Sequence, residues 1–477
     1  MPVGIGVDSR RSTRATFSAA LSTVVLLGAA AQVHGQSPET PVPRRPLGQG
    51  VSVYQPAPGD AARRDVSFPN PTGDMSLRDA VALALMHSPG LASFAWEVRA
   101  LEARVLQSGR PPNPRLEFVS QDFGAARLPG SNSDQPVQPQ TTFQLSQLIE
   151  LGGKRAARMR LSAADRDLGA WDYEAARMDV LTDVSRAFTD VLAAQETLAQ
   201  INEMTRLAEQ TQQTVVARVT AGEASPIEET RATVALASIR LESAQVRRAL
   251  DASRIRLSLL WGNPAPAFTA VAGNLRVEPA ALPAMQDLIA RLDQNPNLKR
   301  WATELSRREA ALAVERSKRV VDMVATTGYR RYTTVDSHAW VAGASVSLPL
   351  FDRNRAGIEE AQSRLAKVSA EQRAAQARLM AALADAYAAL ATAHDEATAL
   401  RTSVLPGAQQ AFDAVSEGYR LGRFGYLDVL EAQRTLVAAG HQHLQALSAY
   451  RKAVASVERL TGSPLGGDAS LQTTGKE

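Results

Sequence analysis

Carboxylates that follow two glycine-containing turns are the side chains of this sequence best suited to chemistry. Asp428 stands three residues after Gly425 and Glu431 three residues later, so the two acids share one face of a predicted helix. Glu228 follows an earlier turn of the same kind. Such acids can bind cations, or they can cap helix starts where backbone amides lack partners. The run Ser225-Pro226-Ile227-Glu228 has the form of a capping box with Pro at the first helical position, and Asp428 allows the same interpretation.

The other residues do not indicate an enzyme active site or a metal site. The sequence has no Gly-rich phosphate loop, no nucleophile elbow and no His-Glu-x-x-His motif. His441 and His443 stand two apart on a predicted helix, so they point to different sides and cannot share one ion. His87, His338 and His394 are isolated. We therefore predict no catalytic residue, no metal ligand and no cofactor.

The stretch EGYRLGRFGYLDVLEAQRTL predicts that one helix ends and another begins within a few residues. Gly422 suits the left-handed position just past a helix end, and Gly425 suits the N-cap of the next helix. The result is a tight helical hairpin. Around this turn, the side chains of Tyr419, Arg423, Phe424 and Tyr426 suit either internal packing or docking of a partner, and we favour docking.

The start of the chain predicts export. Three arginines precede an apolar run over residues 15–31, and small residues end at Gly35, so residues 1–35 are predicted to be a signal peptide. Residues 36–73 are rich in Pro and are predicted to form an extended arm. The absence of cysteine excludes a lipid anchor, disulfides and thiolate metal sites. Arginines mostly alternate with acids along the predicted helices, so the net charge of +4 does not indicate nucleic-acid binding.

The chain repeats itself weakly at a period of about 200 residues. The stretch ARVTAGEASPIEETRATVAL aligns without gaps with the hairpin stretch, pairing Gly222 with Gly422 and Glu228 with Asp428. We predict a first repeat over residues 74–275, a second over 276–463 and a flexible tail over 464–477.

Each repeat is predicted to contain a short helix, a second helix, two strands, a very long helix and a shorter return helix. The strands are expected at about 115–123, 141–148, 322–334 and 339–350, where Phe, Val, Thr and Tyr partly alternate with other residues. The long helices are expected at 154–220 and 353–420, and the return helices at 226–260 and 427–460. The strand pattern equally suits a small soluble sheet.

This layout resembles the TolC family of outer-membrane efflux proteins over residues 75–462. The most specific match is Tyr419-x-x-Gly422 followed by the run LDVLEA at 427–432, which is similar to the family's tip motif. The segment SLPLFDRNRAGIEEAQ at 347–362 further resembles the CzcC-like branch, the outer-membrane components of heavy-metal resistance-nodulation-division (RND) pumps.

The resemblance implies a mainly α, internally duplicated fold with a membrane β part. Three chains would form a long coiled-coil α-helical barrel in the periplasm and one 12-stranded trimeric β-barrel, four strands per chain, in the lipid of the outer membrane. The partners implied are two further copies of the chain, a periplasmic adaptor protein and an inner-membrane RND pump.

The resemblance also implies a passive duct whose cargo is expected to be divalent heavy-metal cations. It places Asp428, Glu431 and Glu228 at the periplasmic entrance, where a ring of carboxylates favours cations. It assigns to the tip turn and adaptor docking the residues Gly222, Tyr419, Gly422, Arg423, Phe424, Gly425 and Tyr426. Three alternatives remain open: a drug-efflux or type I secretion duct of the same fold, a soluble periplasmic coiled-coil scaffold, and, more remotely, a secreted enzyme.

Overall fold

The computed structural model describes residues 70–122, 139–276, 281–333 and 336–465. Contacts divide the chain into residues 1–51 and 52–477, and every described residue belongs to the second unit. The predicted signal peptide, nearly all of the predicted arm and most of the predicted tail lie outside the described residues.

Helices dominate the described chain, which confirms the predicted mainly α fold class. In chain order the elements are β1 (Gly73–Met75), α2 (Leu77–His87), α3 (Pro89–Ser108), β2 (Arg115–Gln121), β3 (Gln140–Ile149), α4 (Lys154–Thr220), α5 (Pro226–Leu259), β4 (Phe268–Val271), α6 (Met285–Arg291), the 3-10 turn η1 (Leu292–Gln294), α7 (Pro296–Ser317), β5 (Met323–Tyr332), β6 (Ser337–Val346), α8 (Arg355–Ala399), the π-helical segment η2 (Leu400–Val404), α9 (Leu405–Arg420) and α10 (Tyr426–Thr461).

The two halves begin in the same way because each carries a cap followed by proline. The Ser88 hydroxyl accepts a hydrogen bond from the Leu91 amide at 3.4 Å, and the side-chain Oδ1 of Asn295 accepts one from the Asn297 amide at 2.8 Å. A proline follows each cap at the first helical position, where its missing N–H costs nothing. These two caps therefore fix where α3 and α7 start.

Four strands form one antiparallel sheet in the order β2-β3-β5-β6, so the central pair joins the two halves of the chain. Gly328 of β5 faces Gln144 of β3, and a Cβ at this position would lie 2.7 Å from the Phe143 carbonyl oxygen. The strand predicted at 339–350 instead ends at Val346. Pro349 lies beyond the strand's end and has no N–H to give to a sheet. A second, parallel pair, β1 with β4, was not predicted.

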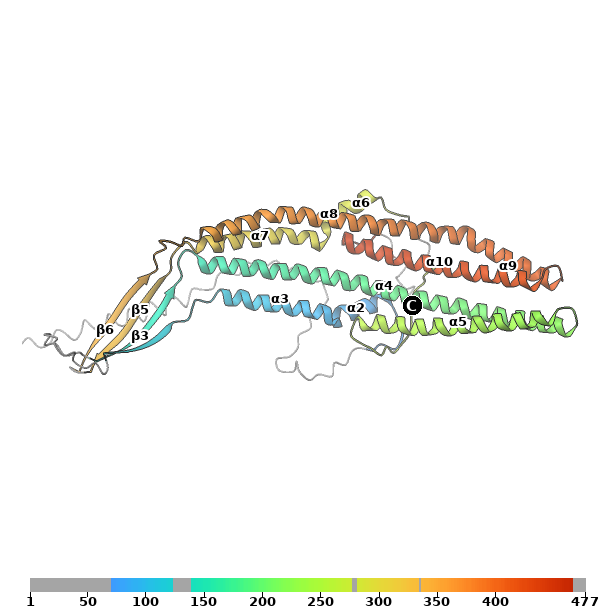
Figure 1. Ribbon diagram of the computed structural model, residues 1–477, viewed down its shortest axis with the longest axis horizontal. Coiled ribbons are helices and arrows are strands. Elements are labelled where there is room, and N and C mark those ends of the chain that lie inside the picture. Colours follow the sequence, from blue (N-terminus) through green and yellow to red (C-terminus); the bar gives the residue numbers. More distant parts are fainter. Residues whose placement is uncertain (1–69, 123–138, 277–280, 334–335, 466–477) are drawn as a thin grey trace, which may run out of the picture. The chain divides into compact units, whose positions relative to one another are not determined.

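Helix α4 organises the helical part. Its 67 residues rise about 100 Å, and its bounds are those of the helix expected at 154–220. It packs against α3, α5, α7 and α10. Gly169 of α4 allows close approach, because a Cβ there would lie 2.5 Å from Leu101 of α3. Figure 1 shows the four-stranded sheet at one end of α4 and the turns of the two hairpins at the other.

The second long helix is not continuous, which corrects the prediction of one helix over 353–420. The α-helical pattern stops at Ala399, five residues are π-helical, and α9 begins at Leu405. The cause is Pro406, which has no N–H to donate and whose ring would clash with the carbonyl four residues earlier. The first hairpin has no equivalent, because α4 contains no proline.

Buried side chains form separate clusters along the helices rather than one core. One cluster, around Trp261 and Phe188, includes residues of β1 and β4. Another, around Tyr450 and Leu383, holds α8 and α10 against α6. A further cluster lies next to the hairpin turns. None of the described helices is long and apolar enough to cross a membrane.

Candidate functional site at the hairpin turns

The two hairpin turns share one backbone geometry. Gly222 and Gly422 adopt φ values of +77° and +70°, the left-handed conformation that favours glycine. The backbone amide of the residue after each glycine donates a hydrogen bond to a carbonyl in the last turn of the preceding helix. Glu223 donates to the Arg218 carbonyl and Arg423 to the Gly418 carbonyl, both at 2.8 Å. These bonds satisfy carbonyls that a helix end would otherwise leave unpaired.

The helices that leave the turns are capped differently. At the start of α5, the Ser225 hydroxyl accepts from the Ile227 amide at 3.4 Å. At the start of α10, Gly425 has no side chain, and its amide instead donates to Asp428 Oδ2 at 2.9 Å. Asp428 is therefore a helix cap, and it is also exposed to solvent. The geometry supports the capping interpretation for Asp428 without removing its charge from the surface.

Glu228 has a partner on the other hairpin. Its Oε2 accepts a hydrogen bond from the Tyr419 hydroxyl at 3.2 Å, across 191 residues of sequence. At this turn Ser225 caps α5, and Glu228 contacts the other hairpin instead of completing the capping box that was considered as an alternative. Burial, followed by the neighbouring Glu228 carboxylate, raises the pKa of Tyr419, so the phenol keeps its proton at neutral pH.

Arg218 also contacts Tyr419. The sequence did not predict this role. The Arg218 guanidinium lies 4.6 Å from the centre of the Tyr419 ring, and its Nη1 donates to the Tyr419 carbonyl at 2.8 Å. Its Nε also lies 3.8 Å from Glu223. No local pattern signals this role, because Tyr419 is 201 residues away.

Tyr419 and Tyr426 are both only 4% exposed, with ring centres 6.1 Å apart. They pack with apolar side chains of both hairpins, among them Val215 of α4 and Phe412 of α9. Burial raises the pKa of Tyr426 as well. For these two tyrosines the structure favours packing over direct docking, which corrects the preference drawn from the sequence.

The remaining residues singled out at the second turn are exposed. Phe424 is 48% exposed and covers Gly418, where a Cβ would lie 2.2 Å from its ring. Arg423 and Glu431 are also exposed. Within the described parts of the chain, no three His, Asp or Glu side chains gather as a metal site.

Comparison of the sequence with known proteins shows which family the chain belongs to. The model of the family described as "Outer membrane efflux protein" matches residues 80–263 and 290–463, one stretch in each half. The cobalt-zinc-cadmium resistance protein CzcC of Cupriavidus metallidurans is 33% identical over 87% of this chain and 98% of its own length. The nickel-cobalt-cadmium resistance protein NccC of Alcaligenes xylosoxydans xylosoxydans is 29% identical over 69% of this chain and 71% of its own length.

A solved structure shows the same fold. A chain of CusC, from a study of its folding and transmembrane channel formation, superposes with a TM-score of 0.69 and 18% identity. The match covers 86% of this chain and 98% of that chain. With the two family-model matches and the CzcC similarity, the chain belongs to the outer membrane efflux protein family, the TolC-type efflux channels of the outer membrane.

Proposed function

We propose that this chain forms, as a homotrimer, the duct through which a tripartite system exports divalent heavy-metal cations. An inner-membrane RND pump and a periplasmic adaptor would deliver the cations, and the duct would conduct them passively. The observation that carries the proposal is 33% identity over nearly the whole length of a cobalt-zinc-cadmium resistance protein. The exposed acids at the second turn fit a cationic cargo.

A face of α5 supports assembly with further copies. Large apolar side chains are 40% to 63% exposed along it: Ile227, Leu241, Ile255 and Leu259. Their spacing is close to the heptad of a coiled-coil seam. Exposed seams of this kind mark association sites. We propose that α5 packs against the α8–α9 edge of a neighbouring copy, while the sheets of three chains close around a common axis in the outer membrane.

Charge supports this pairing. Helix α5 carries six arginines against four acids, whereas residues 385–417 carry five acids against one arginine. Arg248 lies 26 residues after Gly222, and Glu396 lies 26 residues before Gly422. Since both turns lie at the same end of α4 (Figure 1), these two side chains lie at about the same level along the hairpins.

The acids at the turns have different proposed roles. Asp428 and Glu431 are both exposed on one side of α10 and would line the entrance. Glu228 is held by Tyr419 and would help to keep the two hairpins together, not attract cations. Exposed Arg423 and Phe424, with Leu421 and Leu427 at 60% and 54% exposure, would form the surface on which the adaptor docks.

Deletion of the gene in its host tests whether the duct exports metal cations or drugs. Growth should become sensitive to zinc, cobalt or cadmium more than to drugs, and a plasmid copy of the gene should restore tolerance. Unchanged metal tolerance together with strong drug sensitivity would instead place the protein among the drug-efflux ducts.

A further inference from the structure

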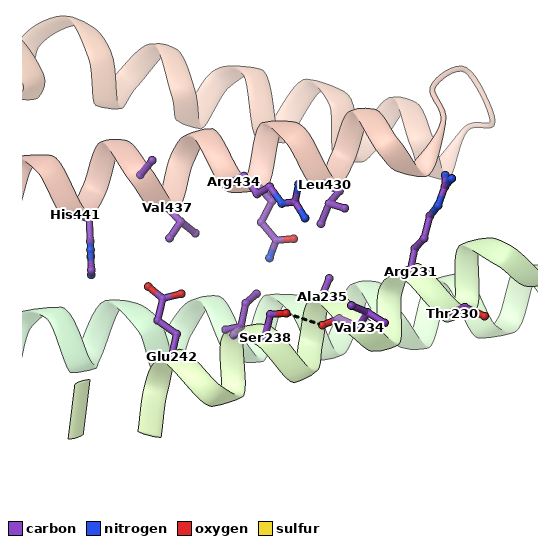
Figure 2. Close-up of a pocket in the computed structure, with 13 residues that line it drawn as sticks. Thr230, Arg231, Val234, Ala235, Ser238, Glu242, Leu430, Arg434, Val437 and His441 are labelled. Carbon is purple, nitrogen blue, oxygen red and sulfur yellow. Dashed lines mark hydrogen bonds between the residues drawn. The ribbon is translucent and has the colours of Figure 1, made fainter. Parts of the chain in front are cut away.

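A groove of about 520 Å³ separates the two hairpins on the side formed by α5 and α10. Its walls are largely apolar, with Val234 and Ile239 from α5 and Leu430 and Val437 from α10. Two groups that can bind metals also line it, Glu242 from α5 and His441 from α10. Figure 2 shows these two side chains pointing toward one another across the groove.

The two side chains lie at the same level because the hairpins match. Glu242 comes 20 residues after Gly222, and His441 comes 19 residues after Gly422. At 1.5 Å per residue, each lies about 30 Å from its turn. Both side chains are half-buried.

Neither group has found a protein partner. His441 Nε2 is enclosed and makes no hydrogen bond with the described residues. Among the same residues, the Glu242 carboxylate takes part in no hydrogen bond or ion pair. Enclosed polar atoms usually have partners, so the unpaired imidazole nitrogen and the carboxylate that faces it are available to bind a ligand.

We propose that this groove binds one divalent transition-metal cation, such as Zn²⁺ or Co²⁺, between His441 Nε2 and the Glu242 carboxylate. Imidazole nitrogen and carboxylate oxygen are common ligands of these ions, and water would fill the remaining positions. Two protein ligands are fewer than the four of a structural zinc site, so binding is weak and exchangeable. Weak binding suits a protein that passes cations on.

Nearby positive charges leave this site accessible to a cation. Arg434 also lines the groove, but seven residues along α10 separate it from His441, a rise of about 10 Å. Arg231 stands eleven residues from Glu242, about 16 Å along α5. Both offsets along the helices are longer than the roughly 4–6 Å over which a neighbouring charge acts most strongly on an ionisable group. His443 is not a ligand: it is buried on another side of α10, where desolvation, followed by positive side chains, lowers its pKa.

One ligand comes from each hairpin, so the cation would hold the hairpins together. His441 follows Gly440, and both Gly440 and Val404 of the π-helical segment lie 18 residues from Gly422. The bridge would therefore lie level with the interruption in the second hairpin. A role for this bridge in metal export rests on the proposed metal cargo, whereas the existence of the binding site does not.

The test uses purified full-length trimer carrying Asp428→Ala and Glu431→Ala, so that the acids at the turn cannot bind the added cation. Titration calorimetry measures the binding of Zn²⁺ to this trimer. One saturable ion per chain is expected. His441→Gln and Glu242→Gln should each weaken binding at least tenfold, because even outer-shell changes cost about 10- to 100-fold. Ca²⁺, which prefers oxygen ligands, should not compete.

His87→Gln and Glu229→Gln are matched controls away from the two proposed ligands and should leave the Zn²⁺ affinity unchanged. Melting temperatures without metal should agree among all variants, because the groove residues are unpaired in the apo chain. The proposal is overturned if no saturable Zn²⁺ binding occurs, or if both groove variants bind like the parent. These measurements do not depend on host metal tolerance, so failure here leaves the proposed function standing.

Discussion

At the scale of single residues, the Tyr419–Glu228 contact joins the hairpins next to their turns. Separation of the hairpins at this point must break the hydrogen bond and expose part of the apolar cluster. The phenol is the donor, and its raised pKa keeps it protonated. The stability that this group contributes is therefore present below pH 10, and it is lost as the pH rises through the raised pKa.

Tyr419→Phe removes the hydroxyl and leaves Glu228 without its partner. We expect a loss of roughly 1–2 kcal/mol in holding the hairpins together. Amides of both turns should then exchange hydrogen roughly 5- to 30-fold faster. Tyr387→Phe is the control, because it removes a hydroxyl that donates to the Pro283 carbonyl away from the turns. Equal exchange at the turns in both variants would mean that the contact restrains nothing.

Asp428 has a charge and a capping oxygen, and Asp428→Asn separates them. Asparagine removes the charge but still offers an oxygen to the Gly425 amide. If the charge attracts cations, Asp428→Asn combined with Glu431→Gln should lose cation selectivity in planar bilayers with little change in melting temperature. Asp428→Ala should in addition weaken the helix start by about 0.3–1 kcal/mol. Selectivity that persists in the Asn/Gln double variant would leave Asp428 as a cap alone.

At the scale of elements, the hairpins differ in the continuity of their first helix. The first has the uninterrupted helix α4, whereas the second has the π-helical segment before Pro406. A π-helical segment is a local irregularity in an otherwise continuous ladder of hydrogen bonds. The second hairpin is therefore expected to bend there more easily than the first.

Pro406→Ala tests this difference. Alanine restores an N–H and removes the ring clash, so residues 400–408 should become regular α-helix. Amide exchange in this stretch should slow, while the equivalent level of α4 stays unchanged. Gly407→Ala serves as a control, because a Cβ there meets nothing within 4 Å and the proline remains. Unaltered exchange in Pro406→Ala would show that the proline is not the cause of the π-helical segment.

At the scale of the whole molecule, the proposed neighbour of α5 can be tested by exchanging charges. Arg248→Glu or Glu396→Arg alone should weaken the detergent-solubilised trimer, because each change places like charges together across the proposed interface. The double variant should restore the trimer mass in multi-angle light scattering. Arg364→Glu is a control on α8, since Arg364 pairs with Glu360 of its own helix. Failure of the double variant to recover would argue against this pairing of edges.

Much of the fold was predictable from residues that act on their immediate neighbours in the sequence. The left-handed glycines at both turns, the proline-marked helix starts and the proline-free run of α4 each act within a few residues, so a single sequence reveals them. The π-helical interruption was missed although Pro406 is visible in the sequence. Its consequence is local as well, which makes this error one of interpretation and not of missing information.

The sequence by itself determined the duplicated helical layout, the turns and the positions of the exposed acids, because helix periodicity and capping depend on neighbours three or four residues apart. Only the tertiary structure decided which side chains meet across the hairpins. Arg218, Tyr419 and Glu228 come together over some 200 residues, as do Glu242 and His441. The physical reason is that packing of α4 against α10 fixes the two hairpins relative to each other, and no interaction within either hairpin encodes that alignment.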